Sequence, residues 1–192
     1  MTECQAKWDR RYQQPRGEIP TVAEVLTQNQ HLLPATGTAL DLACGLGANA
    51  QFLAQAGLNV TAQDISPVAI QQLQQTAQQS GLAINAEVCD VMITPLSAEQ
   101  YNVIVVSYFL ERSLAPALIN ALKPGGLLFY QTWCRHKTAE RGPTNPNFLL
   151  ADNELLCLFA DLNVRIYREE TNLGDVTQGF RDRAMLVAER VV

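Results

Sequence analysis

The stretch Thr-Ala-Leu-Asp-Leu-Ala-Cys-Gly-Leu-Gly-Ala-Asn at residues 38–49 carries the strongest structural signal in the chain. An apolar run enters a turn built on Gly45 and Gly47, and a helical pattern follows at once over 47–56. Glycine permits positive φ angles and lets a ligand approach the backbone without meeting a Cβ atom. The first N–H groups of a helix have no partner within it, so they can bind an anionic group. The stretch therefore predicts a nucleotide-like cofactor site at the carboxyl end of a first strand.

Size and composition indicate a single globular domain. The chain has 192 residues, of which 47% are hydrophobic and 17% charged, enough for one well-filled core. We predict one domain over 1–192, with an N-terminal cap and helix at 1–34 and the remaining core at 35–192. A net charge of −5 disfavours nucleic-acid binding, which depends on Lys and Arg.

The N-terminal residues and the cysteines indicate a cytoplasmic location. Charged side chains occupy positions 3–11, where a secretion signal needs an apolar run, and no apolar stretch reaches the length of a membrane span. The five cysteines form no CxxC pair, which favours free thiols in a reducing compartment. No spacing of His, Cys and Asp suggests a metal site.

Strand and helix patterns alternate along the chain. Strands separated by helices imply an α/β fold with a parallel sheet covered on both faces. The last two strands are joined by a short polar loop and should form an antiparallel hairpin at one edge. Strands are expected at 39–43, 58–63, 83–88, 101–107, 127–133, 164–170 and 183–191, and helices at 21–32, 47–56, 67–81, 114–122 and 153–160.

Two further aspartates follow the second and third expected strands. Asp64 comes nineteen residues after Gly45, where a carboxylate can accept hydrogen bonds from ribose hydroxyls. Asp90 can accept from an exocyclic amine, while the N–H group of Val91 can donate to a ring nitrogen. A helix-capping acid before Ser66 is the alternative for Asp64, and an ordinary loop acid is the alternative for Asp90.

Together with Asp41, the glycine turn and these two acids resemble the motifs of the class I S-adenosylmethionine-dependent methyltransferases. Leu-Asp-Leu-Ala-Cys-Gly-Leu-Gly looks like their first motif, and residues 122–128, Leu-Lys-Pro-Gly-Gly-Leu-Leu, look like their turn into strand five. Ala43 stands where glycine is common and should be tolerated at a strand end. The resemblance implies a doubly wound, Rossmann-like sheet of seven strands in the order 3-2-1-4-5-7-6, with strand seven antiparallel. It also implies S-adenosylmethionine as cofactor, held by Asp41, Cys44, Gly45, Gly47, Asn49, Asp64, Ile65, Asp90, Val91 and Ser107.

Both ends of the chain suggest a subgroup. Residues 8–12, Trp-Asp-Arg-Arg-Tyr, resemble an N-terminal segment of thiopurine and tellurite-resistance methyltransferases that packs over the cofactor. Residues 183–190 resemble the last strand of the tellurite type. The resemblance adds Trp8 and Arg11 as cofactor contacts. A pair of aromatics that only packs a helix is the alternative for Trp8 and Tyr12.

The acceptor side has weaker signals. Ser107 and Tyr108 follow strand four, where this fold places groups next to the transferred methyl, and His136 could act as a base near neutral pH. Core packing of the aromatics and a solvated loop histidine are the alternatives. The sequence therefore offers three catalytic candidates without assigning one. Phe109, Arg112 and Arg135 are candidate substrate contacts, with a solvated charged rim as the alternative for the arginines.

These observations predict a methyltransferase that acts on a small molecule. A soft sulfur, selenium or tellurium nucleophile needs no base, which fits the absence of an obvious acid–base pair in the sequence. A nicotinamide-dependent oxidoreductase using the same turn is one alternative, although the long segment before strand one and Asp90 stand against it. A non-catalytic protein that binds the cofactor to regulate a partner is another.

Overall fold

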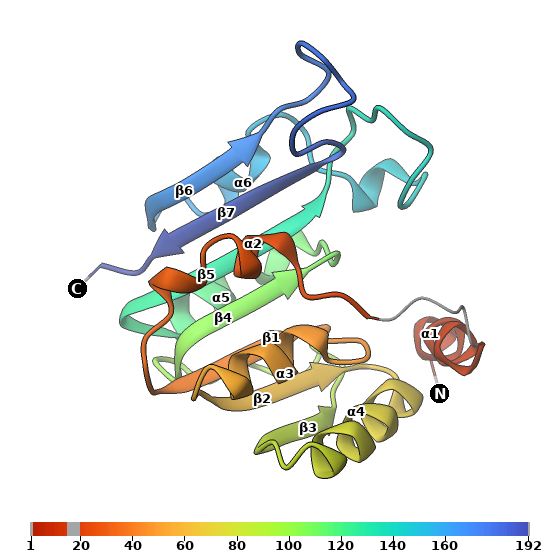
Figure 1. Cartoon of the computed structure of the whole chain (residues 1–192), viewed down its shortest axis with the longest axis vertical. Helices are drawn as coiled ribbons and strands as arrows, with labels where there is room; N and C mark the ends of the chain where they lie inside the picture. Colours follow the sequence, from red (N-terminus) through yellow and green to blue (C-terminus); the bar gives the residue numbers. More distant parts are fainter. Residues whose placement is uncertain (1, 15–19, 192) are drawn as a thin grey trace.

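The computed structural model describes residues 2–14 and 20–191. Its seven strands form one sheet in the order β3-β2-β1-β4-β5-β7-β6, and β7 runs antiparallel to both neighbours (Figure 1). The predicted strand order and the terminal hairpin are confirmed. The strands are β1 (Thr38–Leu42), β2 (Asn59–Asp64), β3 (Ile84–Val88), β4 (Tyr101–Ser107), β5 (Leu122–Trp133), β6 (Asn163–Glu169) and β7 (Arg183–Glu189).

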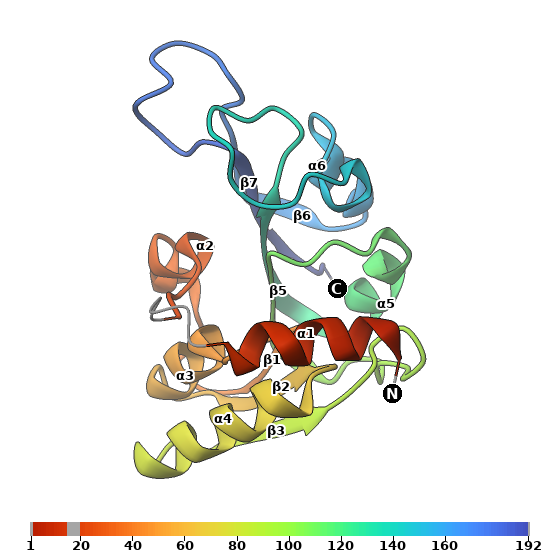
Figure 2. The ribbon, with the colours of Figure 1, turned by 90° about the vertical axis from the view of Figure 1, so that its right-hand side faces the viewer.

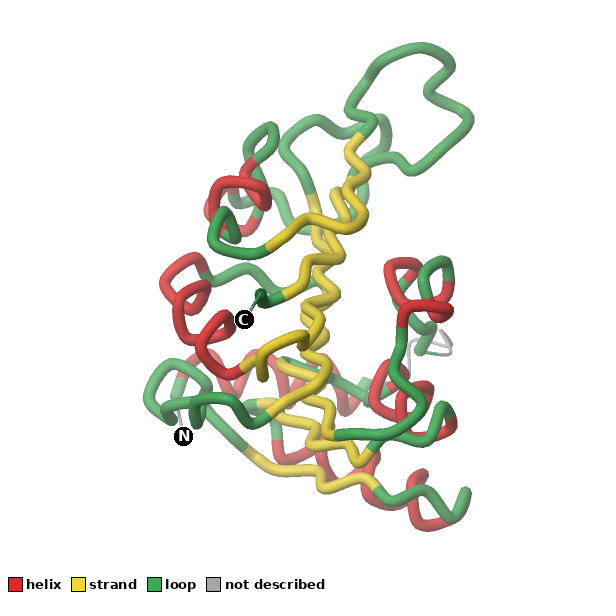
Figure 3. Tube along the Cα trace, turned by 90° about the vertical axis from the view of Figure 1, so that its left-hand side faces the viewer, coloured by secondary structure: helices red, strands yellow, loops and turns green. Residues whose placement is uncertain are grey.

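Helices lie on both faces of the sheet (Figures 2 and 3). One face carries α2 (Glu24–Thr27), α3 (Ala48–Gln55) and α4 (Pro67–Gln79), and the other carries α5 (Ala115–Ala121) and α6 (Glu154–Leu158). Helix α1 (Glu3–Gln13) lies across the edge at which the parallel strands end (Figure 2). Short 3-10 turns occur at Gln30–Leu32, Arg112–Leu114 and Pro146–Phe148.

Strand β4 divides two hydrophobic cores. Ile104 and Val106 belong to the core beneath α5 and α6, whereas Val103 and Val105 belong to the core beneath α2, α3 and α4. All four side chains are fully buried. Because successive side chains of a strand point to opposite faces, a continuous apolar run is needed where both faces are covered. The prediction of a doubly buried strand at 101–107 is confirmed.

Helix α4 shows how the sequence sets the position of its start. The Ser66 hydroxyl accepts from the Ala69 N–H group at 3.3 Å, and Pro67 occupies the first turn. Ile70, Leu73 and the following apolar position face the core, while the glutamines cover the outer side. This start places Ser66 directly after the carboxyl end of β2.

The helix predicted over 21–32 is wrong in extent. Only Glu24–Thr27 is α-helical, and a 3-10 turn follows. The Asn29 amide donates to the Val25 carbonyl at 3.0 Å, so a side chain takes the place of the next helical backbone bond. The chain therefore turns before the helix can extend.

The predicted cover on both faces is incomplete at the β3 edge. Residues 89–100, which join β3 to β4, form turns instead of a helix. Pro95 disfavours helical geometry at the residue before it. Asn85, Glu87 and Val88 consequently remain exposed on β3.

Candidate cofactor and acceptor site

The glycine turn joins β1 to α3, and Asp41 of β1 binds the backbone at the start of α3. The fully buried Asp41 accepts from the Ala50 N–H group with Oδ2 at 2.9 Å, while its Oδ1 has no hydrogen-bond partner among the described residues. Burial raises the pKa of Asp41 to about 7, against the opposing hydrogen bonds from Ala50 and Asn49. The unpaired Oδ1 lacks the hydrogen-bond partner that buried polar atoms normally have, which marks a place for a donor.

Positive φ angles run through the turn. Gly45 has φ +54° and Gly47 has φ +76°, and Ala43 shares this left-handed region at φ +54°. Strand β1 ends at Leu42, so Ala43 lies in the turn and not at the expected strand end. A Cβ atom in the left-handed region costs about 1–2 kcal/mol. The conformation explains physically why glycine suits this position.

Asp64 joins the turn to the end of β2. Its Oδ2 accepts from the Gly45 N–H group at 2.8 Å, and its Oδ1 accepts from the Ser66 N–H group at 2.9 Å. The side chain is buried, and burial raises its pKa despite these hydrogen bonds. Asp64 thus accepts from the N-cap residue of α4 and from the glycine turn, while its contact with a ribose stays a prediction.

Helix α1 covers this cluster through two residues that the sequence analysis did not select. The Ser66 hydroxyl donates to Asp9 Oδ1 at 2.5 Å, and a Cβ atom on Gly45 would lie 2.8 Å from the Tyr12 hydroxyl. Burial raises the pKa of Tyr12, and the nearby charge of Asp64 adds to this. A Cβ atom at position 45 would therefore require the Tyr12 hydroxyl to move.

The two predicted contacts on α1 lie beside Tyr12. Trp8 is half-buried and stacks on Tyr12 with ring centroids 5.8 Å apart, while the exposed Arg11 lies 5.5 Å from the Trp8 ring. Lys7 lies 6.0 Å from the Phe148 ring. Helix α1 therefore extends from the glycine turn to the loop that follows β5.

The end of β3 lies next to Asp64 through the backbone. The Cys89 N–H group donates to the Asp64 carbonyl at 2.9 Å. The next residue, Asp90, is half-buried and accepts from the Met92 N–H group at 3.1 Å. Val91 packs against the core beneath α5 and α6. Strand pairing thus brings the predicted ribose and adenine residues to one edge of the sheet.

Two remaining predicted cofactor contacts flank the turn. Ile65 is half-buried between Asp64 and the start of α4. Cys44 is also half-buried, and burial is the main cause that raises the pKa of its thiol. A protonated thiol is a weak nucleophile, so Cys44 is suited to packing.

Asn49 connects the glycine turn to the end of β4. Its amide donates to the Ser107 hydroxyl at 2.8 Å, and its carbonyl oxygen accepts from the Ala23 N–H group at 2.9 Å. The exposed Tyr108 follows Ser107 with φ +56°. The Tyr108 phenol oxygen accepts from Gln131 at 2.8 Å and from Arg183 at 3.1 Å. A polar network thus runs from the turn to β5 and β7.

The other acceptor-side candidates lie farther along this edge. Arg112 donates to both carboxylate oxygens of Glu154, at 2.6 and 3.0 Å, and to two backbone carbonyls, so it ties a loop to α6. His136 lies 3.2 Å from Asp152 with half of its side chain exposed. Phe109 is half-buried and Arg135 is exposed. Substrate contact by these residues stays a prediction.

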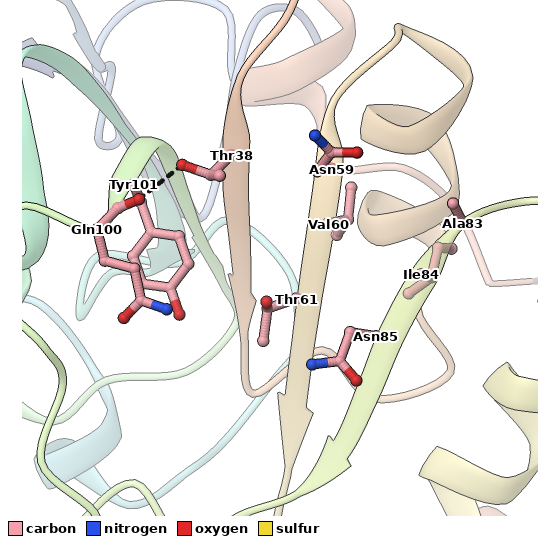
Figure 4. A pocket seen from close by; sticks show the side chains of 9 residues that line it. All are labelled: Thr38, Asn59, Val60, Thr61, Ala83, Ile84, Asn85, Gln100 and Tyr101. Atoms are coloured by element: carbon pink, nitrogen blue, oxygen red, sulfur yellow. Dashed lines mark hydrogen bonds between the residues drawn. The ribbon is translucent and has the colours of Figure 1, made fainter.

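A separate hollow of about 510 Å³ lies at the opposite edge of the sheet. It is lined by residues at the starts of β1 to β4, and Figure 4 shows Thr61, Asn85 and Tyr101 among them. Ligands of open α/β sheets bind at the carboxyl ends of the strands. This hollow is therefore distinct from the cluster around Asp64.

Two kinds of feature are absent from the part of the chain that the structure describes. Within residues 2–14 and 20–191, no group of three or more His, Cys, Asp and Glu side chains is arranged to hold a metal ion. Over the same ranges, no helix combines the length and apolar character that crossing a membrane requires.

The glycine turn, the acids and the turn into β5 fall within one stretch of recognised similarity. Residues 39–126 match the family model described as a methyltransferase domain. Over these residues the chain is similar to methyltransferase domains, and its strand order is the one that this resemblance implies. The cosubstrate of this family is S-adenosylmethionine.

Curated relatives share part of this methyltransferase domain. The chain is 32% identical over 146 residues to Hemagglutinin 1 of Eikenella corrodens, covering 72% of this chain and 48% of that protein. It is 33% identical over 98 residues to Ubiquinone biosynthesis O-methyltransferase of Coxiella burnetii, covering 48% of this chain and 42% of that protein. The chain thus spans less than half the length of these relatives.

Solved structures share the fold of the methyltransferase domain. A protein studied in the conversion of a disulfide bond into a thioacetal group during echinomycin biosynthesis has a TM-score of 0.76 and 21% identity, covering 98% of this chain and 93% of that one. TehB from Haemophilus influenzae has a TM-score of 0.71 and 21% identity, covering 95% of this chain and 67% of that one. At this level of identity the likeness shows the fold alone.

Proposed function

We propose that the protein transfers a methyl group from S-adenosylmethionine to a small-molecule acceptor. The observation that carries the proposal is the Asp64 carboxylate, which accepts from Gly45 and Ser66 at the edge covered by α1. A carboxylate offers about four lone-pair sites, so two remain for the hydroxyls of a ribose. The family match over 39–126 supports the same cofactor.

Other residues around Asp64 suit the rest of that cofactor. The partnerless Asp41 Oδ1 fits a site that receives the cationic amine of a methionine group. Gly45 and Gly47 leave the backbone of the turn open to close approach. Asp90 and Val91 are assigned to the adenine. The remaining proposed contacts are Trp8, Arg11, Cys44, Asn49, Ile65 and Ser107.

When bound, S-adenosylmethionine supplies a methyl group that its sulfonium has already activated. The protein's own task is to position the acceptor and exclude water. Ser107, held by Asn49, is assigned to the wall beside the transferred group. Helix α1 and its Tyr12 form the cover.

The proposed acceptor is a soft nucleophile that reacts without a base. An activated nucleophile normally has a base within hydrogen-bond reach. The described residues place His136 beside Asp152 and solvent, and they place Ser107 beside an amide.

A thermal-shift titration tests the cofactor. S-adenosylhomocysteine should stabilise the protein by about 2.7 kcal/mol at a hundred times its dissociation constant, whereas NADH should leave the melting temperature unchanged. Stabilisation by NADH alone would instead indicate an oxidoreductase.

A transfer assay tests the reaction. Methyl-labelled S-adenosylmethionine is incubated with thiols, selenite and tellurite, and labelled product is expected from at least one of them. Tight binding of S-adenosylhomocysteine without transfer to any of these acceptors would contradict the proposed acceptor class and would favour a regulatory cofactor-binding protein.

A further inference from the structure

We propose that Tyr108 binds the methyl acceptor through its phenol proton, and that Gln131 and Arg183 are positioning residues that fix this phenol. The corresponding acceptor is a flat organic molecule that accepts a hydrogen bond from this phenol through an oxygen or nitrogen, apart from the soft atom that is methylated. The inference rests on the proposed function, because it names an acceptor contact at the edge where β4 and β5 end.

The backbone of Tyr108 is held in an unfavourable conformation. Its φ of +56° lies in the left-handed region, where a side chain costs about 1–2 kcal/mol. The Tyr108 N–H group donates to the Gln131 carbonyl at 2.8 Å, which fixes this geometry against β5. Such strain persists where the surroundings impose it, and it is common at binding sites.

The phenol oxygen of Tyr108 is an acceptor of two hydrogen bonds. Gln131 Nε2 donates to it at 2.8 Å and Arg183 Nη1 donates at 3.1 Å. A hydroxyl has two lone pairs and one proton, so only the proton remains for a further bond. Among the described residues no group accepts this proton, and 42% of the residue is exposed. Tyr108 can therefore act towards a ligand only as a donor.

Both donors to the phenol are themselves fixed. Gln131 is fully buried, and its Oε1 accepts from the Val25 N–H group at 2.8 Å. Arg183 forms an ion pair with Glu24, and its guanidinium lies 4.7 Å from the centroid of the Phe180 ring. Because both are anchored elsewhere, the direction of the free proton is set before a ligand binds.

An aromatic wall stands beside the phenol. The Trp133 ring centroid lies 5.3 Å from that of Tyr108 at 40°. A Cβ atom on Gly142 would lie 2.5 Å from the Trp133 ring, so the glycine backbone packs closely on the indole. On the other side, Ser107 connects Tyr108 to Asn49 and the glycine turn. The phenol thus lies beside a flat apolar surface, and its residue directly follows Ser107 of the proposed cofactor wall.

The charges around the phenol favour an organic acceptor over a compact inorganic oxyanion. Arg183 is balanced by Glu24, and Arg112 is balanced by Glu154. The donor that the phenol itself offers is a neutral O–H group beside an aromatic ring. A neutral donor and an apolar wall match a planar molecule with one lone-pair atom, whereas a tellurite ion would need an uncompensated cation.

The test compares acetophenone with ethylbenzene on the full chain saturated with S-adenosylhomocysteine. The two probes share a benzene ring with a two-carbon substituent, but only acetophenone has an accepting oxygen. Calorimetry should show that Tyr108→Phe weakens acetophenone binding about three- to tenfold, the value of one hydrogen bond. Ethylbenzene binding should change less than twofold. Arg183→Lys should produce the same selective loss, since a lysine cannot keep both the Glu24 and the Tyr108 contacts in this geometry.

Tyr130→Phe is the matched control. Its buried hydroxyl donates to the Phe109 carbonyl at 2.8 Å, away from the Tyr108 phenol, so the variant should not alter the preference for acetophenone. Equal losses for both probes in Tyr108→Phe, no loss for either, or no binding of either probe by the native chain would overturn the inference. Tellurite binding that Tyr108→Phe leaves intact, without acetophenone binding, would overturn the organic class. S-adenosylhomocysteine affinity, measured in the same samples, tests the proposed function separately.

Discussion

Two regions of the sheet edge are stabilised in different ways. The cofactor side surrounds Asp41 and Asp64, and the acceptor side surrounds Tyr108 and Gln131. On the cofactor side, carboxylates bind backbone N–H groups nearby in sequence, as Asp41 binds Ala50 nine residues away and Asp64 binds Gly45 nineteen residues away. On the acceptor side, the Val25 N–H group reaches Gln131 across 106 residues. The cofactor geometry is therefore largely encoded locally, whereas the acceptor geometry requires the complete fold.

The largest expected effect is a pH dependence of the free energy of unfolding that arises from the buried Asp41. Burial raises the pKa of Asp41 to about 7 in the folded protein, from an ordinary value of 3.8. The folded state therefore holds this proton more tightly than the unfolded state, and the free energy of unfolding falls as pH rises from about 4 to 7. Relative to Asp41→Asn, the native chain should lose about 4 kcal/mol over this window. Urea unfolding at several pH values measures it, and parallel pH profiles for the two proteins would refute the assignment.

The next largest effect is on cofactor affinity, and it tests whether Asp64 or Asp90 contributes more to binding. Asp64→Ala should weaken S-adenosylhomocysteine binding by about 1–3 kcal/mol, since it removes a hydrogen-bonded carboxylate. Asp90→Ala should weaken it less, because Asp90 is only half-buried and accepts from one N–H group within its own loop. Isothermal titration measures both constants. The reverse ranking would mean that the roles of the two acids are exchanged.

Replacing Gly45 tests the contact between the turn and α1. Gly45→Ala adds a backbone cost of about 1–2 kcal/mol and a clash with the Tyr12 hydroxyl. Gly81→Ala is the matched control, because Gly81 has φ +63° but no atom within 4 Å of the added Cβ. The melting temperature should fall further for Gly45→Ala, and Tyr12→Phe should recover part of the difference. Equal losses at both glycines would show that α1 does not lie on the turn.

A change on the acceptor side should leave the cofactor side unaffected. Glu24→Gln removes the ion pair with Arg183 and should lower the free energy of unfolding by about 1 kcal/mol. The affinity for S-adenosylhomocysteine should change less than twofold. A large loss of cofactor affinity in this variant would show that the two sides are energetically coupled.

The smallest expected effect is a gain in stability when Ala43 is replaced by glycine. Ala43→Gly relieves the left-handed strain at φ +54°, partly offset by the entropy of glycine in the unfolded chain. We expect the free energy of unfolding to rise by about 0.5–1 kcal/mol, measured by urea titration. A loss of stability would mean that the alanine methyl makes packing contacts that outweigh the strain.

Structure can be predicted most accurately from the sequence where neighbouring residues determine it. Strand β4 was placed at 101–107 because a continuous apolar run must be buried on both faces. Helix α4 was placed by Ser66 and Pro67 at its start. The glycine turn and the acids at the strand ends follow from the same local patterns together with the parallel strand order.

Contacts between distant segments could not be predicted in this way. Asp9 reaches Ser66 across 57 residues, and nothing in the local pattern of α1 indicates it. For Tyr12 a signal existed, because residues four apart share one face of a helix and Trp8 was already a candidate. Likewise, the role of Gln131 depends on Val25 and Tyr108 meeting it from two other segments.

A crystal structure with S-adenosylhomocysteine tests the central claim most directly. The account predicts that the ribose hydroxyls lie within hydrogen-bond distance of Asp64, between the glycine turn and Tyr12 of α1. Ligand density in the hollow at the opposite edge, or an Asp64 carboxylate without contact to the ligand, would contradict it.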